Sequence, residues 1–121
     1  SAASDVYKRQ VYNVQFSAQC DLSGGGNGTI YFWLVQNGVD VPATAGKVVI
    51  AGPNSETIAA WNWVLVLNEG DYIELAWSSA STIAVLLAED ASTSSPVRPA
   101  IPAVILTITW VSPYNTSIGI S

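Results

Sequence analysis

The side chains that most often carry out chemistry are scarce in this chain. Its 121 residues contain no histidine and one cysteine, Cys20, which excludes Ser-His-Asp and Cys-His catalysis, most zinc sites and an intrachain disulfide within these residues. We expect Cys20 to be a small buried apolar side chain rather than a reactive thiol. Two facing carboxylates could still hydrolyse a glycosidic bond, but no pair is singled out by its spacing. We therefore predict no catalytic residues and no enzymatic activity.

A cation site is the next chemistry that the residue types allow. Glu69, Asp71 and Glu74 gather around one predicted turn. Calcium sites draw more oxygen ligands than this from an irregular loop, so we interpret the three acids as solvated turn charges. The sequence therefore predicts neither a metal site nor a cofactor.

A carbohydrate-binding site is the third kind of site to consider, because sugars stack on exposed indole rings. The chain has five tryptophans, and all of them lie inside predicted strands, where packing in a core or an oligomer interface is their ordinary use. A carbohydrate-binding surface is the alternative reading. The candidate core or interface aromatics are Phe16, Trp33, Trp61, Trp63, Tyr72, Trp77 and Trp110.

Composition narrows the possible classes of protein further. Half of the residues are hydrophobic and 11% are charged, which is the opposite of a disordered chain, and the length fits one domain. Nine acidic residues against four basic ones give a net charge of −5, so binding to nucleic acid phosphates is not expected. No apolar run reaches the length of a membrane span.

Hydrophobic periodicity predicts an all-β domain that would position these residues. Alternation is strict from Tyr12 to Cys20, with Val14, Phe16 and Ala18 on the apolar face, and Asn37-Gly38 is a strong hairpin turn signal. Short strands separated by turns at this spacing indicate a sandwich or a closed Greek-key barrel. The expected strands cover residues 12–20, 29–36, 39–41, 47–50, 58–67, 72–77, 83–87 and 103–111.

The run at residues 58–67 is apolar at nearly every position and is also compatible with a helix. Its tryptophan and valine content, and the turn at residues 68–71, favour a strand. We expect residues 72–77 to pair back on it across that turn.

Two of the expected strands have almost no polar face. Residues 58–67 offer only Asn62, and residues 103–111 offer only Thr107 and Thr109. A monomer would expose an unusually large apolar patch there, so we expect a homo-oligomer that buries these faces. The alternative is a thicker sandwich in which the two sheets cover them internally.

The first ten residues, Ser1 to Gln10, show no apolar periodicity. They resemble the in-frame translation of a transposase adapter used in sequencing-library preparation, and such a segment is excluded from fold reasoning. Because the chain has no methionine, we expect it to be a fragment or a processed product. The expected organisation is a non-native segment at 1–10, one domain at 11–112 and a tail at 113–121.

Four segments of the sequence resemble a recurrent domain of tailed-phage structural proteins. The most specific of them contains Trp61-Asn62-Trp63-Val64 followed by Gly70-Asp71-Tyr72-Ile73-Glu74-Leu75. Within it, a strand that ends in Leu67-Asn68-Glu69-Gly70-Asp71 and is followed by a strand with aromatic residues is also similar to trimeric C1q/TNF-like jelly rolls. Val35 departs from the pattern, because a basic residue is expected there. The four segments are Tyr12–Gln19, Trp33–Pro42, Ala60–Trp77 and Pro99–Thr109.

The resemblance implies an antiparallel jelly-roll sandwich of the C1q/TNF-like type that assembles as a homotrimer. It further implies a non-enzymatic virion or extracellular protein, displayed as a fibre, tail or head-decoration module. Its partners would be other copies of itself, other virion proteins and, for host attachment, a host-surface glycan. A carbohydrate-binding module of a secreted microbial protein remains the alternative.

Overall fold

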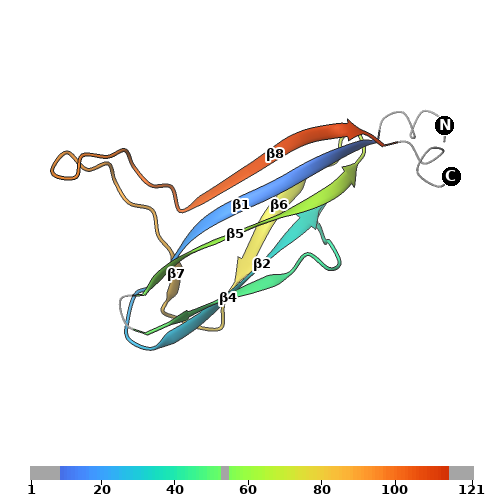
Figure 1. Cartoon of the computed structure of the whole chain (residues 1–121). Coiled ribbons are helices and arrows are strands. Elements are labelled where there is room, and N and C mark those ends of the chain that lie inside the picture. Colours follow the sequence, from blue (N-terminus) through green and yellow to red (C-terminus); the bar gives the residue numbers. More distant parts are fainter. Residues whose placement is uncertain (1–8, 53–54, 115–121) are drawn as a thin grey trace.

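The computed structural model describes residues 9–52 and 55–114, and every regular element in that part of the chain is a β-strand (Figure 1). The adapter-like residues 1–8 and most of the predicted tail lie outside the described residues. Each strand expected from the sequence is present, including the one at residues 58–67. In chain order the strands are β1 (Gln10–Leu22), β2 (Asn27–Gln36), β3 (Val39–Asp40), β4 (Gly46–Ala51), β5 (Glu56–Leu67), β6 (Ile73–Ser78), β7 (Ala84–Leu86) and β8 (Val104–Pro113).

The strands form two antiparallel sheets that pack face to face, so the predicted all-β sandwich is confirmed. In the first sheet β1 is central, with β5 along one side and β7 and β8 in succession along the other. In the second sheet β2 is central, with β3 and β4 along one side and β6 along the other. The jelly-roll type of connectivity stays a prediction.

The alternation predicted for β1 is confirmed by its burial. Val14, Phe16, Ala18 and Cys20 point into the core, and the residues between them point away from it. β2 faces them with Ile30, Phe32 and Leu34, and both sheets therefore contribute one apolar face each to the core.

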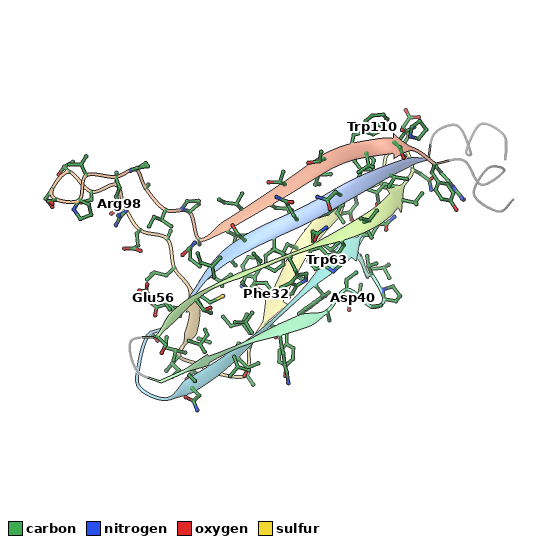
Figure 2. All side chains as sticks on the ribbon, in the orientation of Figure 1. Phe32, Asp40, Glu56, Trp63, Arg98 and Trp110 are labelled. Atoms are coloured by element: carbon green, nitrogen blue, oxygen red, sulfur yellow. The ribbon has the colours of Figure 1, made fainter. Side chains whose placement is uncertain are left out.

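Aromatic rings join the two sheets at the centre of the core. The Phe16 ring lies 5.0 Å from the Phe32 ring, 4.6 Å from Trp61 in an edge-on contact and 5.5 Å from Trp63 in a stacked one. Figure 2 shows Phe32 and Trp63 in the space between the sheets. Aromatic pairs of this kind add to stability beyond the area that they bury.

The sandwich is tightly closed where β4 faces β5. Gly46 on β4 lies so near the Trp61 ring that an added Cβ would be 2.8 Å from the ring atom Cζ2. Beside it, the Trp63 indole nitrogen donates a hydrogen bond of 3.0 Å to the Thr44 carbonyl. Glycine is therefore required at this position because a side chain would collide with the Trp61 ring, and not because of its φ angle.

One predicted pairing is wrong. Residues 72–77 do not pair with 58–67, because β5 pairs with β1 in the first sheet and β6 pairs with β2 in the second. The turn between them crosses from sheet to sheet, and Asp71 fixes it there by accepting hydrogen bonds from Gln36 and Asn37. This crossing lets Leu75 of β6 pack against the core.

Between β7 and β8 the chain leaves the body as a hairpin, which we call the arm (residues 88–102; Figure 1). Bridges join Glu89 to Ile101 and Ser92 to Arg98, with backbone hydrogen bonds of 2.8–3.1 Å. The Arg98 guanidinium lies 3.3 Å from the Glu89 carboxylate. The arm therefore has its own internal order.

We predict that Gly46→Ala destabilises the protein by about 1–3 kcal/mol, because the new methyl group overpacks against Trp61. Gly25→Ala is the matched control, since an added Cβ there meets no atom within 4 Å. Urea unfolding followed by tryptophan fluorescence measures both. Equal unfolding free energies for the two variants would contradict the close packing of Gly46 on Trp61.

Candidate functional site

The first sheet turns one face away from the core, and this face carries no charge over five successive rows of paired residues. The nearest charged residues along the chain are Arg9, two residues before Val11 of the first row, and Asp21, which lies opposite Glu56 beyond the last row. We call these rows the outer face. Across β5, β1 and β8 they are Val66–Val11–Ser112, Val64–Asn13–Thr109, Asn62–Gln15–Thr107, Ala60–Ser17–Ile105 and Ile58–Gln19.

The β5 margin of the outer face is mainly apolar, and its centre and β8 margin are mainly polar. Ile58, Val64 and Val66 lie on the β5 margin and Ile105 is the apolar residue of the β8 margin, all of them exposed. The second sheet packs on the opposite side, and no residue in ranges 9–52 and 55–114 buries these four side chains, so the two sheets do not hide this face between them.

The polar centre is linked by side-chain hydrogen bonds. Asn62 Nδ2 donates to Asn13 Oδ1 at 2.7 Å, and Asn13 Nδ2 donates to Gln15 Oε1 at 3.3 Å. These bonds satisfy part of the hydrogen-bonding capacity of the three side-chain amides within the sheet itself. A partner could therefore cover the centre at a lower desolvation cost than free amides would impose.

A shallow hollow of about 290 Å³ lies in the middle of the outer face. It forms where the small side chains Ser17 and Ala60 lie opposite each other, with Asn62, Thr107 and Ile105 around them. Its walls carry no charged group. It can receive an uncharged side chain of a partner.

A second uncovered surface lies on β8. Leu106, Ile108 and Trp110 are paired with core-facing residues of β1, so their side chains point to the core side, yet they are 37–55% exposed. Trp77 on β6 is paired with the buried Phe32 and is 50% exposed. We call these four residues the open side. Figure 2 shows Trp110 near the end of β8 that is remote from the arm.

The structure separates the aromatic residues that the sequence grouped together. Phe16 is buried, and Trp61 and Trp63 pack against it as half-buried side chains. Trp33 is also half-buried, and its indole nitrogen donates a 2.8 Å hydrogen bond to Asp40. The remaining three are exposed: Tyr72, Trp77 and Trp110.

Sequence reasoning missed the individual residues of the outer face. The signal was present, because the alternate positions of β5 and β8 that form this face are all uncharged, but Val64 and Ile105 were not singled out. Without the strand pairing, nothing in the sequence shows that the two strands flank β1 and contribute to one surface.

The acidic turn is a hydrogen-bonded structural element. Asp71 accepts hydrogen bonds from the Asn37 side chain at 2.9 Å, the Asn68 backbone at 2.7 Å and the Gln36 side chain at 3.2 Å. These bonds, that from Asn37 above all, lower the pKa of Asp71. Among residues 9–52 and 55–114 no three acidic, histidine or cysteine side chains form a group that could hold a metal ion.

Two further findings bear on the remaining site classes. Burial raises the pKa of the Cys20 thiol, so this cysteine is a buried thiol at neutral pH, as predicted.

Nowhere in the described ranges is there a helix with the length and hydropathy needed to cross a membrane.

Comparison of the chain with protein-family models, with curated proteins and with solved structures finds no match. The candidate binding surfaces are therefore identified from the geometry of the structure. Two uncharged surfaces, the outer face and the open side, meet along β8, and neither is covered by the described part of the chain.

We predict that Asp71→Ala lowers the free energy of unfolding by about 1 kcal/mol at neutral pH, because three donors lose their charged acceptor. Since the pKa of Asp71 is lower in the folded state, its contribution is fully present above about pH 4 and is lost as the pH falls through the folded value. The difference between the variant and the parent protein should therefore shrink in urea unfolding at about pH 2.

Glu74→Ala on β6 is the control, because this exposed carboxylate has no such partners. A difference between the Asp71 variant and the parent that stays constant from neutral to acidic pH would contradict the hydrogen-bonded role of this carboxylate.

Proposed function

We propose that this chain is a non-enzymatic structural domain of a tailed-phage virion and assembles as a homotrimer through its outer face. The observation that carries the proposal is the uncharged surface of five rows across β5, β1 and β8. Copies of a chain with a net charge of −5 repel each other, so they associate most favourably where no charge is present.

The exposed apolar area of the outer face favours association. Its side chains Ile58, Val64, Val66 and Ile105 together expose on the order of 400 Å², about half of what each partner contributes to a standard protein interface. Full burial of one such aliphatic side chain contributes roughly 1.5–3 kcal/mol. Several of them around a symmetry axis offset the entropy lost on association.

The assignment to a virion rests on the resemblance of four sequence segments to tailed-phage structural domains. These segments form most of β1, the end of β2 with the following turn, β5 with β6, and the start of β8. In this proposal the sandwich is a trimeric jelly roll in a fibre, a tail or a head decoration. The arm and the loop at residues 23–26 are displayed to other virion proteins or to a host-surface glycan.

A carbohydrate-binding module is the second candidate, and one specific observation favours it. Trp77 and Trp110 are about half exposed, as a sugar-stacking platform requires. The other three indoles are only partly accessible. The Trp110 indole nitrogen donates a 2.7 Å hydrogen bond to the Gln10 side chain, which fixes one edge of that ring.

We predict that Val64→Lys on the outer face converts the oligomer to monomer at micromolar concentration, because it places a desolvated charge in the interface. Val49→Lys is the matched control, since Val49 is equally exposed but lies on the outward face of the second sheet. Sedimentation equilibrium measures both variants. A monomeric parent protein would refute the proposal.

Acrylamide quenching separates the two candidates. If the chain assembles, fluorescence of the parent oligomer should be quenched weakly, and the Val64→Lys monomer should be quenched more strongly. If it is a carbohydrate-binding module, quenching should not depend on assembly, and a soluble oligosaccharide should reduce it in the parent but not in Trp77→Ala or Trp110→Ala.

A further inference from the structure

The chain contains the dipeptide Asn-Gly twice, as Asn27-Gly28 and Asn37-Gly38. Asparagine in this dipeptide is prone to lose its side-chain amide, because glycine has no Cβ to hinder the approach of its own nitrogen. The glycine nitrogen attacks the asparagine Cγ, a C–N bond forms, and ammonia leaves with the glycine proton. Water then opens the resulting succinimide ring, and the residue becomes aspartate or isoaspartate. The structure shows which of the two dipeptides is open to this reaction.

The glycine of the first dipeptide is held in the second sheet. Gly28 is buried and lies opposite Ile50 where β2 pairs with β4. The Leu34 carbonyl accepts a hydrogen bond from the Val41 N–H, so the backbone groups of Leu34 point to the β3 and β4 side of β2. Every second residue of a strand points the same way, and Gly28 is one of them. Its N–H is therefore engaged with β4 and cannot attack Asn27.

The glycine of the second dipeptide lies in the exposed turn between β2 and β3. Asn37 has a φ of 52° and Gly38 a φ of 81°, which is the pair of left-handed residues that a tight two-residue hairpin turn requires. The ladder closes outside them, between Gln36 and Val39. Within the described ranges the Gly38 N–H donates no backbone hydrogen bond in this turn. Its nitrogen is therefore available for the reaction.

The asparagine of this second dipeptide is held by the turn that leads into β6. Asn37 Nδ2 donates a hydrogen bond of 2.9 Å to the Asp71 carboxylate, and Asn37 Oδ1 accepts one of 3.0 Å from the Tyr72 N–H. We call these two bonds the turn contact. They fix the side-chain amide against residues 71 and 72, so the Asn37 Cγ must leave the turn contact before the Gly38 nitrogen can reach it.

We propose that Asn37 is a site of spontaneous deamidation, that the turn contact limits its rate, and that the reaction breaks this contact. A carboxylate at position 37 has no proton to donate to Asp71 and faces it with a like charge, which is unfavourable. The turn contact helps to direct β6 to the second sheet, so its loss loosens the junction of β2 and β6. This inference does not depend on the proposed assembly.

Peptide mass spectrometry of the full chain, incubated at mildly alkaline pH, tests the site and its control by the turn contact. We expect conversion of the amide to the acid at Asn37 and several-fold slower conversion at Asn27. Asp71→Ala removes the acceptor and should accelerate conversion at Asn37 several-fold while the rate at Asn27 stays unchanged. Equal rates at the two sites in the parent protein would overturn the proposal. So would an Asp71→Ala variant in which neither rate changes or both rise together, because the turn contact would then not be the limiting step.

Urea unfolding of Asn37→Asp, which has the product side chain, tests the consequence. We expect a lower urea midpoint than in the parent protein at neutral pH. Asn27→Asp is the matched control and should keep the parent midpoint, because Asn27 Oδ1 only accepts a hydrogen bond, from the Gly52 N–H at 3.0 Å, and a carboxylate can do the same. Adding Asp71→Asn to Asn37→Asp exchanges the donor and the acceptor and should recover part of the loss. An Asn37→Asp variant with the parent midpoint would show that deamidation does not break the turn contact.

Discussion

The contact of the Phe16 ring with Phe32, Trp61 and Trp63 is the interaction on which the rest of the fold depends. Phe16 lies in the middle of β1, the strand that pairs along its length with β5 on one side and with β8 and β7 on the other. Phe32 lies on β2, the central strand of the other sheet. The contact therefore joins the centres of both sheets and fixes which face of each is the core.

The position of this aromatic cluster makes the sandwich asymmetric. Trp61 and Trp63 both come from β5, so the large rings fill the half where β5 faces β4, and Gly46 leaves room for one of them. The half that contains β6 and β8 has no such filling, and Trp77 and Trp110 remain exposed there although their register places them on the core side. The open side is therefore uncovered because the large core aromatics lie in the other half of the sandwich.

Local pattern was enough to predict the strands and the core face of β1, because alternation over Tyr12–Cys20 determines which residues are buried. It was not enough to predict pairing. Residues 72–77 had the hairpin signal to pair with 58–67, but hydrogen bonds of Asp71 to residues from a distant turn direct β6 to the other sheet. Composition likewise did not distinguish Trp61 from Trp110. Both lie in apolar strands next to β1, and only the sheet order places one under β4 and leaves the other without a cover.

In the proposed assembly a second copy covers the outer face and the margin of β8. Hydrogen–deuterium exchange across a dilution series measures this most directly, because the amides of an edge strand become protected when a neighbour covers them. We expect exchange in Val104–Pro113 and Glu56–Leu67 to slow as the protein concentration rises, while exchange in Gly46–Ala51 on the other sheet stays unchanged. Exchange in β5 and β8 that is rapid and independent of concentration would contradict it.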